Sequence, residues 1–127
     1  MGWRNEVDFE SIVGKTFTRV EGKEGDEIIR FIGDESFVMY YEHDCCASCS
    51  VDDITGDLAD LENTPILSAE EAISGEWPEG VVRSDADDSF TWTFYRIRTI
   101  KGTVVIRWFG TSNGYYSESV TFEKVGE

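Results

Sequence analysis

The chain has 127 residues and a formal net charge of −15, and 40% of its residues are hydrophobic and 13% aromatic. This apolar content is too high for a disordered chain, so the sequence predicts one folded domain over residues 1–127. The negative charge argues against direct binding to nucleic acid, because such affinity comes largely from Lys and Arg. The longest apolar run, residues 37–41, is far shorter than the roughly 20 residues that cross a bilayer, so no membrane contact is expected.

The acidic side chains are concentrated in the middle of the chain. Residues 42–89 hold fourteen acidic residues and one basic residue, whereas residues 90–127 hold five basic residues and three acidic ones. A field of this sign attracts basic partners. We therefore expect a basic host protein or a nucleic-acid-processing complex, in whose basic groove spaced carboxylates imitate phosphates. The alternative is that the charge serves only solubility.

The first third of the chain predicts a short helical turn and then three antiparallel strands. The turn covers residues 8–13, and the strands cover residues 15–21, 27–32 and 36–42, which are rich in β-branched and aromatic side chains. Glycine-containing turns separate the strands. Consecutive strands joined by short turns indicate an antiparallel meander.

A short amphipathic helix is predicted over residues 52–62. A Ser-x-x-Asp pattern typical of a helix start precedes it, and Ile54, Leu58 and Leu61 then follow at helical spacing. The helix is expected to end before Pro65, because the residue before a proline avoids the helical conformation.

Three acidic residues fall on one face of this predicted helix: Asp53, Asp57 and Asp60. Carboxylates can bind calcium, but these residues lack the alternating order of a calcium-binding loop. They are therefore predicted either to contact a basic partner or to form a solvated acidic face.

The carboxyl third predicts three further strands, over residues 90–100, 103–109 and 115–125. The Asn113-Gly114 pair favours a tight hairpin between the last two strands, because both residues tolerate positive φ. These three strands are expected to form a second meander.

Between the helix and these strands, residues 66–73 are predicted to form a strand or a helical stretch, and residues 74–88 an exposed loop. The apolar residues of the strand over residues 90–100 change parity near Phe94, which indicates either a β-bulge or burial of both faces. Together the elements predict an α+β domain that is mostly antiparallel β. Its curved sheet is expected to have about six strands, with one short helix and a C-terminal three-stranded meander.

The only histidine and all three cysteines lie within residues 43–49. Zinc prefers thiolate and imidazole ligands, so this segment is a candidate zinc site. The alternatives are buried thiols without a ligand, or a cysteine nucleophile activated by the histidine. Clustered cysteines without a disulfide framework also indicate a reducing compartment. The candidate metal ligands are His43, Cys45, Cys46 and Cys49.

Aromatic residues of the carboxyl third are candidates for a ligand-binding face. Most are expected in the core, because aromatic side chains supply much of the buried area of a small β domain. Those that remain at a sheet edge would be free to contact a ligand. The candidates are Trp92, Tyr95, Tyr115 and Tyr116.

Several motifs resemble those of a known family. The resemblance covers roughly residues 37–122, and it is to a family of small uncharacterised proteins of bacteriophages and prophages, a domain of unknown function. It implies a phage or prophage accessory protein in the host cytoplasm, of a kind that often acts in host takeover or against host defence. The motifs are Asp44-Cys45-Cys46, Gly56-Asp57-Leu58-x-Asp60-Leu61, Trp92-Thr93-Phe94-Tyr95 and Asn113-Gly114-Tyr115-Tyr116-Ser117.

The leading functional hypothesis is therefore a small acidic intracellular protein that acts by binding, as a monomer or a homodimer. The alternative is a small-ligand or metal-binding domain, or an enzyme, that uses residues 43–60.

Overall fold

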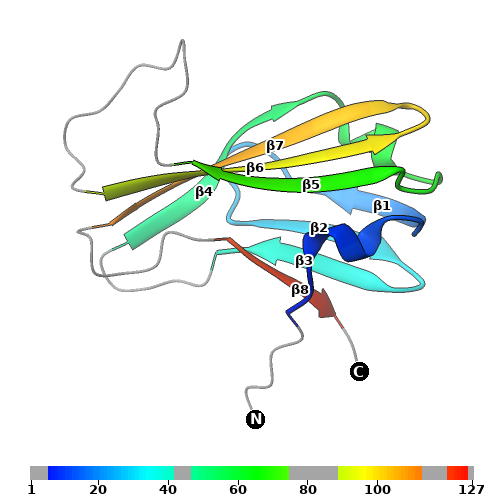
Figure 1. The fold of residues 1–127 in the computed structure, drawn as a ribbon, viewed down its shortest axis with the longest axis horizontal. Helices are drawn as coiled ribbons and strands as arrows, with labels where there is room; N and C mark the ends of the chain where they lie inside the picture. The colour runs from blue at the N-terminus through cyan, green and yellow to red at the C-terminus, as the bar shows by residue number, and fades with distance from the viewer. Residues whose placement is uncertain (1–5, 42–46, 75–88, 113–119, 126–127) are drawn as a thin grey trace.

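The computed structural model of the chain describes residues 6–41, 47–74, 89–112 and 120–125. In these ranges two four-stranded antiparallel sheets pack face to face (Figure 1). One sheet has the strand order β1-β2-β3-β8 and the other has the order β4-β7-β6-β5. The prediction of a mostly antiparallel β protein is confirmed.

The first sheet consists of short strands that alternate buried and more exposed side chains. Ile29 and Met39 lie opposite each other in register, and both are fully buried. This alternation is typical of a sheet with one face on the core, and the predicted amino-terminal meander is confirmed. The strands are β1 (Phe17–Glu21), β2 (Ile28–Gly33), β3 (Ser36–Tyr40) and β8 (Thr121–Val125).

The second sheet is built around a long hairpin of β6 and β7, whose register is unbroken from its first pair to its last. The inner face of β6 is buried through Tyr95 and Ile97, and its outer face is buried at Trp92 but exposed at Arg96 and Arg98. Two-sided burial, rather than a bulge, therefore explains the change of apolar parity. The strands are β4 (Ala47–Thr55), β5 (Ser68–Ser74), β6 (Ser89–Thr99) and β7 (Gly102–Ser112).

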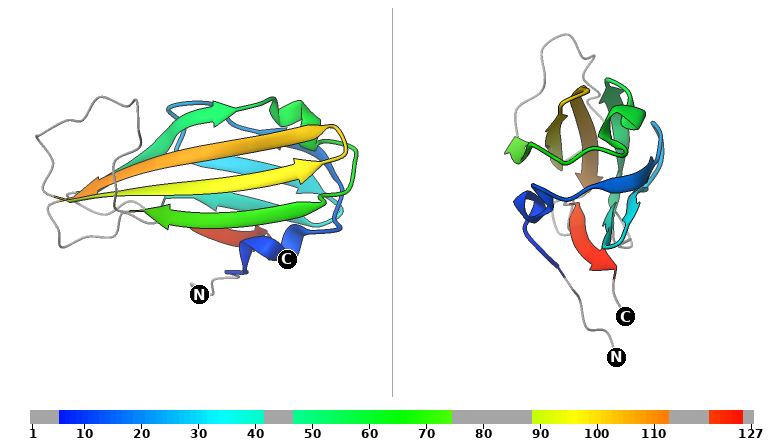
Figure 2. Two further views of the ribbon diagram at one scale, coloured as in Figure 1. Left: turned by 45° about the horizontal axis from the view of Figure 1, so that its top comes forward. Right: turned by 90° about the vertical axis from the view of Figure 1, so that its right-hand side faces the viewer.

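The prediction of a single curved sheet is wrong, because the chain forms two layers (Figure 2). Each sheet carries a row of large apolar side chains on one face, and two such faces cover each other. A buried hydrogen bond links the layers, in which the Trp108 Nε1–H of β7 donates to the Met39 Sδ of β3 at 3.1 Å.

The prediction of a helix over residues 52–62 is wrong. Residues as far as Thr55 belong to β4 and pair with β7, and only a 3-10 turn, η2 (Leu58–Leu61), follows. Gly56 interrupts the segment with a φ of 98°. The hydrogen bonds that β4 makes with β7 along its length stabilise the strand more than the local helix-start pattern stabilises a helix.

The predicted carboxyl-terminal meander is also wrong, because its last strand joins the other sheet, where β8 pairs with β3. Phe122 of β8 packs in the core against Phe9 and Phe37, with ring centroids 5.1 and 5.6 Å away. Burial of this ring favours the pairing with β3 over a hairpin with β7. The Asn113-Gly114 turn lies outside the described residues.

One side of the two-layer structure is closed by backbone pairing. Val51 of β4 donates its N–H to the Asp26 carbonyl and accepts a hydrogen bond from the Gly25 N–H, both at 2.8 Å. The edge of β4 is therefore joined to the turn between β1 and β2.

The other side is bridged by the amino-terminal segment rather than by direct strand pairing. The 3-10 turn η1 (Phe9–Ile12) confirms the predicted helical turn and lies between β5 and β8 (Figure 2). Val7 donates its N–H to the Phe122 carbonyl at 3.2 Å, and Gly14 donates to the Ile66 carbonyl at 2.7 Å. No helix in the described ranges is long and apolar enough to cross a membrane.

Candidate functional site: an acidic pocket between the sheets

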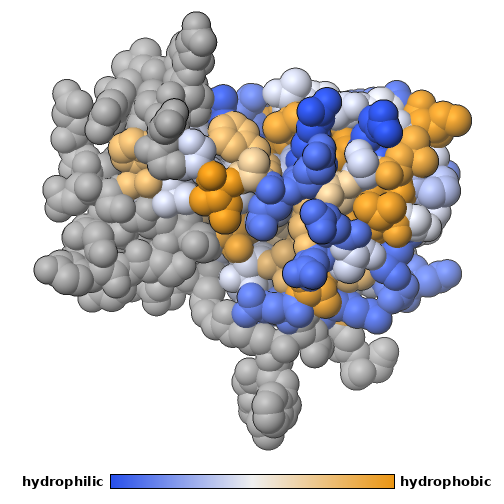
Figure 3. All heavy atoms as spheres, in the orientation of Figure 1, coloured by the Kyte–Doolittle hydropathy of each residue, from blue (hydrophilic) through white to orange (hydrophobic). Residues whose placement is uncertain are grey.

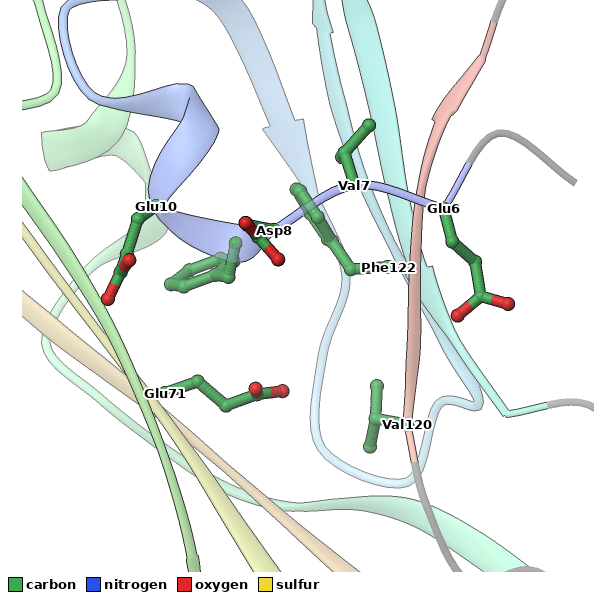
Figure 4. Close-up of a pocket in the computed structure, with 8 residues that line it drawn as sticks. Glu6, Val7, Asp8, Glu10, Glu71, Val120 and Phe122 are labelled. Carbon is green, nitrogen blue, oxygen red and sulfur yellow. The ribbon is translucent and has the colours of Figure 1, made fainter.

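A pocket of about 430 Å³ opens between β5 and β8, beside the amino-terminal segment. In Figure 4, Glu71 reaches from β5 into the opening, Asp8 and Glu10 approach it from the amino-terminal segment, and Val120 lies next to β8. Three parts of the chain that are distant in sequence therefore meet here. The lining residues are Glu6, Val7, Asp8, Phe9, Glu10, Glu71, Val120 and Phe122.

Charge of one sign surrounds this acidic pocket. Four of its eight lining residues are acidic, and the lining contains no Lys, Arg or His. Within the described ranges Asp8, Glu10 and Glu71 take part in no salt bridge, and the Asp8 side chain does not cap η1. The Glu6 carboxylate lies farther out, beside β8 (Figure 4). Asp8, Glu10 and Glu71 therefore give the pocket a negative lining, although they do not lie close enough together to form a metal-binding group.

The floor of the acidic pocket is apolar. Phe9 is only 5% exposed, and its ring contacts those of Tyr95 and Phe122, with centroids 4.7 and 5.1 Å away. The stems of Lys and Arg side chains are apolar and their heads are charged, and aromatic rings attract cations. Phe9 and Phe122 are only 5% and 6% exposed, however, so the surface of the pocket that is open to a ligand is mostly polar, and its carboxylates match the charged head of such a side chain.

The alternation of β5 places Glu71 at the pocket. Glu71 lies opposite Tyr95 in register, so its side chain is on the inner face of the sheet, as is that of the buried Ala69. A carboxylate on an inner face normally loses hydration at a large cost in free energy. β5 is the edge of its sheet, and Glu71 therefore stays exposed to solvent.

Tyr95 lies fully buried behind Glu71 and Phe9, and its hydroxyl is near the Glu71 carboxylate but makes no hydrogen bond of full geometry with a described residue. Burial raises the pKa of Tyr95 far above its ordinary value, and the charge of Glu71 raises it further. The hydroxyl is therefore neutral at all ordinary pH values and keeps its proton available for donation. A buried hydroxyl without a full hydrogen bond is costly, and it is the one such group beside this pocket among the described residues.

The surface on this side of the molecule is mixed rather than uniformly charged. Figure 3 shows hydrophilic side chains gathered over β5 and η1, with hydrophobic surface between them. Ile73 of β5 is 63% exposed and adds to the apolar part. Mixed surface of this kind is found both on ordinary protein surfaces and at sites that contact another protein.

The structure does not bring the three predicted acidic residues together on a helix face. Asp53 lies on β4, where its carboxylate accepts a hydrogen bond from the Thr55 hydroxyl at 3.1 Å. Asp57 caps η2 by accepting from the Ala59 N–H at 2.9 Å, and Asp60 lies within η2. None of the three lines the acidic pocket, and their contact with a partner stays a prediction.

The predicted aromatic residues are distributed over opposite faces of β6. Tyr95 lies in the core, whereas Trp92 lies on the outer face. The ring centroids of Trp92 and Phe109 are 4.4 Å apart, and the Arg107 guanidinium lies 5.2 Å from the Trp92 ring centroid. Arg107 is held in turn by an ion pair with Asp52. Trp92 and Tyr95 therefore do not share one pocket. The other two candidates, Tyr115 and Tyr116, lie outside the described residues.

The candidate zinc ligands are only partly within the described ranges. Cys49 is buried on the inner face of β4, whereas His43, Cys45 and Cys46 lie outside the residues that the structure describes. The described residues contain no group of three or more metal-ligating side chains. The zinc site stays a prediction, and the metal content of protein purified in metal-free buffer tests it.

Sequence reasoning missed Asp8, Glu10 and Glu71 as site residues. The strand alternation of Ala69, Glu71 and Ile73 would have placed Glu71 on the inner face, but the sequence left open whether residues 66–73 form a strand or a helix. The approach of η1 to β5 has no local sequence pattern at all.

Comparison with known proteins gives a family but no activity. No curated protein and no solved structure matches the chain. A family model described as a domain of unknown function (DUF7448) matches residues 10–122. This match covers nearly all of the described structure and half of the residues that line the acidic pocket, with residues 6–9 outside it. The chain therefore belongs to the DUF7448 family of domains of unknown function.

Proposed function

We propose that this protein is a binding module that holds a basic side chain of a protein partner in the acidic pocket between β5 and β8. The observation that carries the proposal is that Asp8, Glu10 and Glu71 line one pocket with no basic residue in the lining. A guanidinium or ammonium group would supply the missing positive charge beside these carboxylates.

The charge of the whole chain supports the same partner class. A net charge of −15 steers basic proteins toward the molecule and repels acidic ones. Steering of this kind acts mainly on the association rate and is screened by salt. The proposal therefore includes binding that weakens as the ionic strength rises.

The resemblance to phage and prophage proteins extends the proposal to a biological setting. We infer an accessory protein of the host cytoplasm, whose partner is a basic host protein or a nucleic-acid-processing complex and whose role is host takeover or anti-defence. The support for this setting is the resemblance and the acidity of the chain, because membership of the DUF7448 family assigns no activity.

The first test removes one carboxylate of the acidic pocket. Glu71→Gln is expected to weaken binding of a hexa-arginine peptide about threefold to tenfold, because one partly exposed ion pair contributes about 1 kcal/mol. Isothermal titration calorimetry at low salt measures the dissociation constant.

Glu70→Gln is the matched control for this test. Glu70 is the preceding residue of β5 and carries the same charge, but it lies on the outer face of the sheet opposite Arg96, away from the acidic pocket. This variant is expected to change the affinity by less than about twofold. Equal weakening by the two variants would mean that the peptide responds to net charge, and the proposal would then be wrong.

A further inference from the structure

The strand β5 has one partner, β6, and its other side is a sheet edge. Figure 2 shows β5 at the margin of its sheet, with η1 beside only part of its length. A sheet edge presents unpaired N–H and C=O groups, which are a template for another extended segment. The acidic pocket lies on this same side, because Glu71 belongs to both.

The register shows which residues of β5 direct their backbone groups to the free edge. Thr99 and Gly102 pair across a two-residue hairpin loop, so their backbones are hydrogen-bonded to each other. Successive residues of a strand direct their backbone N–H and C=O groups to opposite sides. Because Thr99 bonds to β7, the odd-numbered residues of β6 bond to β7 and the even-numbered residues bond to β5. Glu70 and Ala72 of β5 face the even-numbered residues, and Glu71 and Ile73 therefore point their N–H and C=O away from β6.

This free edge is open at Glu71 and Ile73. Ala69 also points its backbone outward, but it is only 4% exposed, and η1 packs against β5. Glu71 and Ile73 are exposed, and no hydrogen bond from another described residue reaches their outward-facing backbone groups. The free edge therefore offers two consecutive hydrogen-bonding positions next to the acidic pocket.

We propose that the partner enters as an extended segment that adds a strand to β5 at Glu71 and Ile73. Residues opposite each other in a sheet share a face, so the residue facing Glu71 places its side chain in the acidic pocket. That residue is Arg or Lys, and the residue that faces Ile73 is apolar. The inference rests on the proposed function and adds that the basic side chain belongs to an extended segment of the partner.

Charge disfavours a second copy of β5 as the added strand in the register centred on Glu71. Antiparallel pairing of β5 with itself around Glu71 would place two Glu71 side chains directly opposite each other, where like charges destabilise the pair. A basic extended segment meets the same edge with complementary charge. The acidic edge thus disfavours self-association and favours the proposed partner.

The test uses short peptides that differ only in backbone methylation. The parent peptide has about seven residues, alternates Val and Thr, and carries one Arg at its centre. N-methylation of the Arg residue blocks a group directed at β5, whereas N-methylation of the two flanking residues blocks groups directed away from it. Fluorescence anisotropy of the labelled peptides measures their affinity for the full chain.

Strand addition predicts that methylation at the Arg weakens binding at least about tenfold, while methylation of the flanking residues changes it less than about twofold. Ile73→Pro removes an outward-facing N–H at a position where an edge strand tolerates proline, and it is expected to weaken the parent peptide about fivefold or more. Ile73→Ala keeps this N–H and is the matched control, expected to bind several-fold better than Ile73→Pro.

The outcomes separate the two proposals. If both methylated peptides bind as tightly as the parent and Glu71→Gln still weakens binding, the pocket holds an Arg side chain without strand pairing, and only the inference is wrong. If the parent binds no better than a peptide with Glu in place of Arg, both the inference and the proposed function are wrong.

Discussion

Glu35 is the residue with the best-defined electrostatic environment in the described ranges. Its two carboxylate oxygens accept from Lys15 Nζ at 2.6 Å and from Lys124 Nζ at 2.8 Å, and they thereby join the start of β1 to β8. The hydrogen bond from Lys124 is the largest cause that lowers the pKa of Glu35 from its ordinary 4.5 to about 2, and Lys15 adds to it. The site is exposed, so salt screens the effect.

This lowered pKa predicts how stability depends on pH. A carboxylate with a lower pKa in the folded state contributes stability that is complete above about 4.5 and is lost as the pH falls toward about 2. The difference in the free energy of unfolding between the wild type and Glu35→Gln is therefore expected to shrink between neutral pH and this acidic range. Urea denaturation across this range measures it, and NMR titration of the Glu35 carboxyl checks its pKa. A titration midpoint at the ordinary 4.5 would contradict the ion pairs.

At the scale of the element, Gly56 decides how β4 ends. Its φ is 98°, and a Cβ at this position would lie 2.7 Å from the Thr103 carbonyl oxygen of β7. Only glycine combines this backbone conformation with so close an approach. Gly56 therefore allows the chain to turn from the end of β4 into η2 while its backbone stays in close contact with β7.

Gly56→Ala is expected to lower the free energy of unfolding by about 2–4 kcal/mol, because strain in the backbone adds to a clash with β7. Gly25→Ala is the control, since Gly25 has a similar φ of 91° but no atom within 4 Å of the added Cβ. It should cost only the backbone strain, about 1–2 kcal/mol. Chemical denaturation measures both variants, and an equal cost would show that the approach of Gly56 to Thr103 is unimportant.

The elements that the sequence predicted well are those whose pattern is local. Most amino-terminal strands and β7 alternate between apolar and polar side chains, and β6 joins β7 through a two-residue turn. The helix over residues 52–62 failed because Ile54, Leu58 and Leu61 fit helical spacing, although Ile54 in fact faces the core from a strand. The sheet assignment of β8 failed because its partner, β3, lies about 80 residues earlier in the chain, and such pairing leaves no trace in a local pattern.

At the scale of the whole molecule, the two layers are joined by backbone pairing on one side and by the amino-terminal segment on the other. The acidic pocket lies on this second side, between the edges of β5 and β8. It depends on Asp8, Glu71 and Val120, which only the fold brings together. The sequence predicted an acidic protein with a basic partner and contact residues at Asp53, Asp57 and Asp60, which stay a prediction, but charge density alone could not locate this concave site.

The most direct measurement is an NMR titration of the isotope-labelled chain with the arginine peptide, which reports the binding position residue by residue. Binding in the acidic pocket predicts that the largest backbone chemical-shift changes fall on residues 7–10, on Glu71 and Ile73, and on Phe122. Changes centred instead on residues 53–60, or spread evenly over the acidic surface, would contradict binding in the pocket between β5 and β8.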